Sequence, residues 1–130
     1  MPGKKILLID DDKDVVLALN VRLKSKGFEV CVAGDAISAI SVARKEKPDL
    51  IVLDIGLPGG DGFVVMQRIK SLYELALIPI IVVSARDATA TKVRAMQAGA
   101  AAYFQKPVDT KAFLAAIHKA LGQIAVQQEA

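Results

Sequence analysis

Polar residues that could carry out chemistry follow four short apolar runs of this 130-residue sequence. They are Asp10 and Asp11 after ILLI, Asp54 after LIVL, Ser84 after IIVV, and Lys106 two residues after AAYF. Three carboxylates close together repel one another, and a hard divalent cation such as Mg²⁺, which prefers oxygen ligands, relieves that repulsion. A metal ion, an ammonium and a hydroxyl around one carboxylate suit phosphoryl transfer, in which the carboxylate can form an aspartyl phosphate.

The elements that must position these residues follow from the alternation of apolar runs with helical patterns. Strands are expected over Ile6–Ile9, Phe28–Val32, Leu50–Leu53, Ile78–Val83 and Ala101–Phe104. Helices are expected over Lys13–Lys26, from Ala36 to before Pro48, from Asp61 to about Leu72, over Ala88–Ala98, and from Asp109 to about Leu121 or Ile124. The predicted N-caps are Asp12, Asp35, Asp61 and Asp109. This order predicts a doubly wound, five-stranded parallel α/β sheet with helices on both faces.

The polar residues should meet because parallel strands end at the same edge of a sheet, where ligands bind in open α/β folds. The run Phe28–Val32 brings only Val32 and Ala33 to that edge, so this strand is expected at the border of the sheet. Lys106 must turn back toward Asp54 directly after its strand, and we therefore predict a cis peptide bond between Lys106 and Pro107.

The composition describes one globular domain, with 53% hydrophobic and 24% charged residues. Cys31 is the single cysteine, which excludes a disulfide framework and a thiolate zinc site. No apolar run reaches the length of a membrane span, and we expect a cytoplasmic protein without membrane insertion. The net charge of +3 comes from the second half of the chain and forms no clustered basic stripe, so direct nucleic-acid binding is not expected.

The order and spacing of these pieces resemble the receiver domain of two-component response regulators over residues 4 to about 121. The matching pieces are Asp10-Asp11 after ILLI, Asp54 in VLDIGLPGGDGF, Ser84-Ala85 after IIVV, Gly99-Ala100, Tyr103 and Lys106-Pro107. The resemblance implies a flavodoxin-like fold with strand order 2-1-3-4-5. It also implies that residues 1–122 form the receiver domain and that residues 123–130 form a tail or linker stub.

The resemblance implies a role for each residue of the site. The phosphoryl acceptor would be Asp54, and the Mg²⁺ ligands would be Asp11, Asp54, the backbone carbonyl of Gly56, and Asp10 through water. The residues that bind the phosphoryl group would be Ser84 and Lys106, and the switch residues would be Ser84 and Tyr103. Two positions depart from the usual pattern, since Gly56 often has a larger side chain in the family and Arg86 stands two residues after Ser84. Both positions line the route to the phosphoryl group, so the resemblance does not fix how long Asp54 would stay phosphorylated.

The implied function is a phosphorylation-activated signalling switch without a separate turnover reaction. A sensor histidine kinase, a phosphotransfer protein or a small phospho-donor would supply the phosphoryl group. The output face would be the helix Ala88–Ala98, the following strand and the last helix, which would bind a protein partner or a second copy of the chain. The helix Ala88–Ala98 has a thin apolar stripe, Val93 and Met96, and is expected to be the least firmly anchored helix. The basic residues Lys92, Arg94, Lys111 and Lys119 favour an acidic partner at this face.

Other functions fit the sequence less well. A phosphohydrolase with an aspartyl-phosphate intermediate would need D-x-D-x-[TV] after the first strand and an insertion that caps the substrate. An EF-hand starting at Asp10 would need Gly and Glu where Val15 and Val21 stand. No P-loop motif is present.

Overall fold

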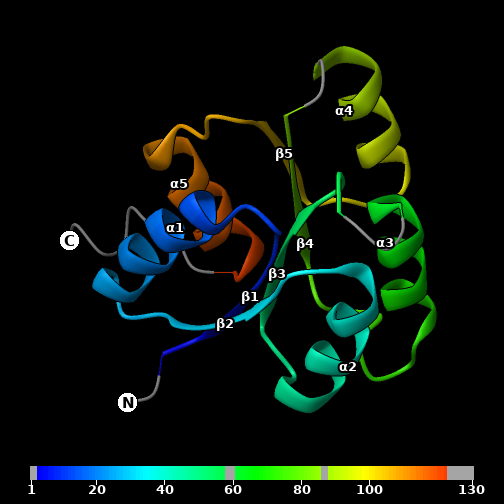
Figure 1. The fold of residues 1–130 in the computed structure, drawn as a ribbon, viewed down its shortest axis with the longest axis horizontal. Coiled ribbons are helices and arrows are strands. Elements are labelled where there is room, and N and C mark those ends of the chain that lie inside the picture. The colour runs from blue at the N-terminus through cyan, green and yellow to red at the C-terminus, as the bar shows by residue number, and fades with distance from the viewer. Residues whose placement is uncertain (1–2, 58–60, 86–87, 123–130) are drawn as a thin grey trace.

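The computed structural model describes residues 3–57, 61–85 and 88–122 (Figure 1). Within these residues five parallel strands form one sheet in the order β2-β1-β3-β4-β5. The strands are β1 (Lys5–Ile9), β2 (Glu29–Ala33), β3 (Leu50–Asp54), β4 (Ile80–Ser84) and β5 (Ala102–Gln105). The helices are α1 (Lys13–Ser25), α2 (Ala36–Glu46), α3 (Gly62–Ser71), α4 (Ala88–Gln97) and α5 (Thr110–Ala120). The predicted doubly wound parallel fold and its strand order are confirmed.

Helices cover both faces of the sheet: α1 and α5 lie on one side, and α2, α3 and α4 lie on the other (Figure 1). Strand side chains alternate between the two layers, as the two-residue period of a strand requires. Leu7 and Ile9 of β1 pack under α2 and α3, whereas Ile6 and Leu8 pack under α1 and α5. All five residues of β3 are buried, because this strand is covered on both faces. No helix in the described ranges is long and apolar enough to cross a membrane.

Among the residues that the structure describes, aspartates begin four helices, as predicted. Their side chains accept backbone N–H groups of the first helical turn, which satisfies donors that have no partner inside the helix. The four N-caps are Asp12, Asp35, Asp61 and Asp109. Apart from the alternative end of the last helix at Ile124, the predicted helix and strand boundaries lie within two residues of the observed ones. The predicted inward position Ile124 and the predicted tail 123–130 lie outside the described residues.

The inner face of α4 is not the predicted one. Val93 and Met96 remain 52% and 44% exposed, and Ala95 is the fully buried side chain. The small side chain of Ala95 lets the helix backbone lie close to the core under α3, so the larger Val93 and Met96 face outward. The expectation of a weakly anchored helix is consistent with this packing, since alanine buries little apolar area.

Gly62 at the start of α3 should tolerate no side chain. A Cβ added there would lie 2.3 Å from Cα of Ile55 and 2.8 Å from its carbonyl oxygen, in the loop that follows Asp54. Because these are backbone atoms, the loop itself would have to move. We expect Gly62→Ala to destabilise the protein by about 1–3 kcal/mol in urea unfolding. The matched control is Gly34→Ala, where an added Cβ meets nothing within 4 Å; equal effects of the two substitutions would contradict the prediction.

Candidate functional site

The carboxyl end of the sheet gathers every polar residue that the sequence singled out there. Asp54 and Ser84 are the last residues of β3 and β4, and Lys106 follows β5 by one residue. Asp10 follows β1 and is held by backbone bonds on both sides: its N–H donates to the carbonyl of Ala33 at 3.1 Å, and its Oδ1 accepts the N–H of Asp12 at 2.9 Å. Asp54, Asp10 and Ser84 are buried, with 6%, 5% and 1% exposure.

Lys106 joins two of these carboxylates. Its Nζ lies 2.9 Å from Oδ2 of Asp10 and 3.3 Å from Oδ2 of Asp54. Its backbone N–H donates to the carbonyl of Ser84 at 2.8 Å, which fixes the turn that directs the side chain inward. The Lys106–Pro107 peptide bond is cis, as predicted.

Three carboxylates could share one metal ion. Ligand atoms of Asp10, Asp11 and Asp54 lie within 4.8 Å of one another, with Asp11 exposed and the other two buried. Oxygen donors of this kind suit Mg²⁺, a hard cation that keeps several waters and takes few protein ligands. Gly56 is exposed beside them, and its N–H donates to Oδ1 of Asp54 at 2.9 Å. The residues present therefore fit a magnesium ion.

The family model of the response regulator receiver domain matches residues 6–118. The chain belongs to this family. Receiver domains are signalling modules of two-component systems, not separate enzymes. The flavodoxin-like fold described above is thus that of a receiver domain.

Solved receiver structures agree with the fold over nearly the whole chain. A putative response regulator from Chloroflexus aurantiacus is 27% identical, with a TM-score of 0.88, covering 93% of this chain and 99% of that one. The BeF3-activated receiver domain of Klebsiella pneumoniae RstA is 28% identical, with a TM-score of 0.84 and coverages of 92% and 99%. The receiver domain of the Pseudomonas aeruginosa sensor histidine kinase PA1611 is 26% identical, with a TM-score of 0.84 and coverages of 93% and 99%. That last structure has a magnesium ion coordinated in its active-site cleft.

The surroundings of the site act differently on the charged forms of Asp10 and Lys106. Burial raises the pKa of Asp10, and the N–H of Asp12 and the ammonium of Lys106 offset only part of that effect. Burial by itself lowers the pKa of Lys106, but its contacts with Asp10 and Asp54 outweigh burial and raise it. The lysine is therefore firmly charged, while ionised Asp10 is held at a cost in free energy.

The two predicted switch residues lie on neighbouring strands, β4 and β5. Ser84 is buried at the rim, next to the site. Tyr103 packs against the core under α3 and α4, and its hydroxyl is buried without a hydrogen-bond partner among the described residues. The aromatic ring thus already points into the molecule in this structure. Arg86, the predicted departure on the route to the site, lies outside the described residues.

One contact near the site was not foreseen. Arg94 of α4 lies over the ring of Phe63 at 4.0 Å and 3.8 Å from Oδ2 of Asp61, both on the α3 side. A cation–π contact of this kind joins two helices that the sequence gives no reason to pair. Arg94 is therefore engaged with α3, whereas the sequence analysis counted it among the basic residues of the face formed by α4, β5 and α5.

Magnesium should stabilise this receiver domain through Asp11. We expect Mg²⁺ at 100 times its Kd to add about 2.7 kcal/mol to the free energy of unfolding, because it binds the folded state alone. Asp11→Asn should lose most of that gain in thermal unfolding with MgCl₂ or EDTA. Asp14→Asn, an exposed carboxylate in the first turn of α1, is the control and should keep it. An equal gain in both variants would exclude Asp11 as a ligand.

Proposed function

We propose that this receiver domain is a phosphorylation-activated switch in which Asp54 accepts the phosphoryl group. The observation that carries the proposal is the position of Lys106 Nζ, 2.9 Å from Asp10 and 3.3 Å from Asp54, beside three carboxylates at one rim. The donor would be a phosphohistidine of a sensor kinase or phosphotransfer protein, or a small phospho-donor. The receiver domain would comprise residues 1–122, followed by a tail or linker stub, and would act in the cytoplasm.

The residues divide the work of phosphoryl transfer. Oδ1 of Asp54 accepts the N–H of Gly56, and Oδ2 faces Lys106, so the carboxylate is fixed before the donor arrives. A carboxylate oxygen of Asp54 attacks phosphorus, the phosphorus–nitrogen bond of the donor breaks, and its electron pair returns to the imidazole. Lys106 then neutralises charge on the transferred group, and the Ser84 hydroxyl donates to it.

Mg²⁺ would neutralise part of the charge on the phosphoryl oxygens. Its ligands would be Asp11, Asp54 and the carbonyl of Gly56, with Asp10 acting through water. The support for this set is the clustering of the three carboxylates and the magnesium site of the PA1611 receiver domain.

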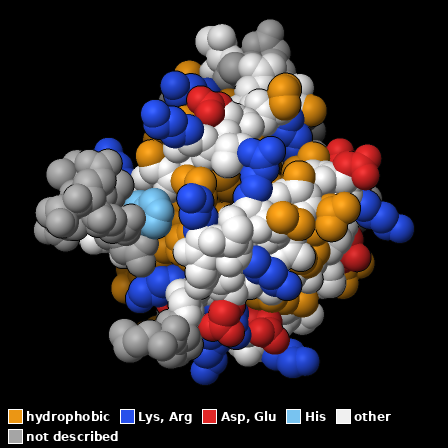
Figure 2. Space-filling model, turned by 90° about the vertical axis from the view of Figure 1, so that its left-hand side faces the viewer, with side chains coloured by type: hydrophobic (Ala, Val, Ile, Leu, Met, Phe, Trp, Pro, Cys, Tyr) orange, Lys and Arg blue, Asp and Glu red, His pale blue; other side chains and the backbone are white. Residues whose placement is uncertain are grey.

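The signal would leave through α4, β5 and α5. Drawing the Ser84 hydroxyl toward a phosphoryl group on Asp54 would alter the packing next to Tyr103, which packs against the core cluster that includes Ala95 of α4. Lys92, Lys111 and Lys119 are exposed on α4 and α5 and would attract an acidic partner or a second copy of the chain. Figure 2 shows Lys and Arg side chains spread over the side of the molecule that carries α1 and α5.

The test of this proposal is a map of amide chemical shifts with and without beryllofluoride and Mg²⁺. Beryllofluoride occupies the place of a phosphoryl group, so we expect shifts at Asp54 and Ser84, and further shifts in α4, β5 and at Tyr103. Changes confined to the metal site would contradict the output face while leaving the acceptor site in place.

A further inference from the structure

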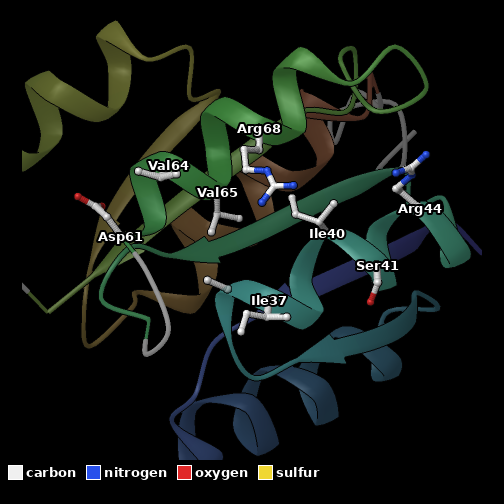
Figure 3. A pocket seen from close by; sticks show the side chains of 9 residues that line it. Ile37, Ile40, Ser41, Arg44, Asp61, Val64, Val65 and Arg68 are labelled. Carbon is white, nitrogen blue, oxygen red and sulfur yellow. The ribbon is translucent and has the colours of Figure 1, made fainter.

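A groove separates α2 from α3 on the side of the sheet away from α1 and α5 (Figure 3). Its volume is about 380 Å³, and aliphatic side chains form its middle. Ile37 is 81% exposed and Val64 is 52% exposed, on either side of the groove. An isoleucine this exposed beside a second aliphatic residue marks an apolar surface that another chain would bury with a gain in free energy.

The two ends of the groove carry opposite charges. Both helices follow strands of a parallel sheet, so their amino ends lie together near the phosphorylation site and their carboxyl ends lie together at the far edge. The carboxylates Asp35 and Asp61 cap the amino ends. Arginines Arg44 and Arg68 lie in the last turns.

The guanidinium of Arg68 is available for a partner. Arg44 is paired with Glu74 at 3.0 Å, whereas no ion pair or hydrogen bond joins the Arg68 side chain to another described residue. Figure 3 shows the Arg68 side chain reaching from α3 toward Ile40 across the groove. Oδ2 of Asp61 is only loosely held, 3.8 Å from Arg94 and 41% exposed.

We propose that a second copy of this chain covers the α2–α3 groove in a two-fold symmetric, antiparallel arrangement. The two-fold axis places the acidic amino end of one copy opposite the basic carboxyl end of the other, so Arg68 of each copy faces Asp61 of the other. Such an interface is self-complementary, as a two-fold contact must be. Ile37 and Val64 of both copies lose their exposed area at its centre. The arrangement requires no phosphorylation and lies on a different face from α4, β5 and α5.

We favour a second copy of the chain over a different protein as the occupant of the α2–α3 groove. A different protein would have to present an acid, an aliphatic group and a base in the reverse order of this face, whereas a rotated copy of the face presents them already.

Charge reversal separates the alternatives. Sedimentation velocity over a concentration series should show reversible dimers of the wild type. Arg68→Glu sets a carboxylate of one copy against Asp61 of the other, and Asp61→Lys sets an ammonium against Arg68, so each variant alone should lose at least about tenfold in dimer affinity. An equimolar mixture of the two variants restores opposite charges at both ends, and it should form heterodimers with nearly the affinity of the wild type.

Two further variants keep the test decisive. Ile37→Lys should weaken the dimer without unfolding the domain, because that side chain is 81% exposed; it replaces Asp61→Lys if loss of the α3 N-cap impairs folding. Lys24→Glu, on an exposed position of α1 that belongs to neither face, should leave the dimer unchanged. A wild type that stays monomeric, a dimer insensitive to Arg68→Glu and Ile37→Lys, or a dimer broken by Lys24→Glu would overturn the proposal.

Discussion

Asp54→Asn should abolish the mass gain of one phosphoryl group when the protein is incubated with a small acyl phosphate and Mg²⁺. The amide keeps the size of the carboxylate but lacks the nucleophilic oxygen that must attack phosphorus. The wild type should gain one phosphoryl group per chain, because Asp54 is the carboxylate that is buried, hydrogen-bonded by the N–H of Gly56 and adjacent to Lys106. Intact-protein mass spectrometry measures the gain directly.

The matched control lies at the other end of the same strand. Asp49 precedes β3 and is exposed, with Oδ2 accepting the N–H of Lys5 at 2.7 Å. Asp49→Asn should therefore gain a phosphoryl group as the wild type does. Equal labelling of Asp54→Asn and wild type would reject Asp54 as the acceptor. Rapid consumption of many donor molecules per chain would instead favour the phosphohydrolase alternative over a switch.

Much of the fold could be predicted because its signals are local. The runs ILLI, LIVL and IIVV are continuously apolar, as strands buried on both faces must be, and each ends at a polar residue. An aspartate before each of four helices fixes their starts through hydrogen bonds to the first turn. Once these elements alternate, the parallel sheet and the meeting of its strand ends follow from topology.

The rotation of α4 could not be predicted in the same way. Its sequence offers alanines and Val93 and Met96 in several phases, so no single stripe fixes which side faces the core. In the structure Ala95 is the side chain of α4 that packs into the core. Val93 and Met96 therefore face outward, and Arg94 lies over Phe63. These contacts depend on how closely α4 can approach α3, and no local pattern encodes that distance.

The residues of the site could be predicted from the sequence, but which carboxylate lies nearest to Lys106 could not. Sequence reasoning placed Lys106 opposite Asp54, whereas the structure brings it closer to Asp10, at 2.9 Å against 3.3 Å. Asp10 holds this position through the backbone of Ala33 and Asp12. The lysine therefore lies against the two buried carboxylates, and Asp11 is the exposed member of the cluster.

Lys106→Met should raise the affinity of the site for Mg²⁺ and lower the rate at which Asp54 is phosphorylated. Removing the ammonium takes a positive charge from beside the three carboxylates, so Mg²⁺ should bind at least about tenfold more tightly. The same loss removes the group that stabilises charge on the transferred phosphoryl oxygens, so phosphorylation of Asp54 should slow by roughly 10–100-fold. Titration calorimetry with MgCl₂ measures the first effect, and the time course of mass gain measures the second.

The control has the same change in net charge at a distance from the site. Lys119→Met alters an exposed lysine of α5 and should change neither Mg²⁺ affinity nor the phosphorylation rate. Methionine keeps most of the length and apolar volume of lysine, so the effects of Lys106→Met report on the lost charge. A slower reaction accompanied by weaker Mg²⁺ binding would point to a collapsed site. An unchanged rate would mean that the 3.3 Å contact with Asp54 plays no part in phosphoryl transfer.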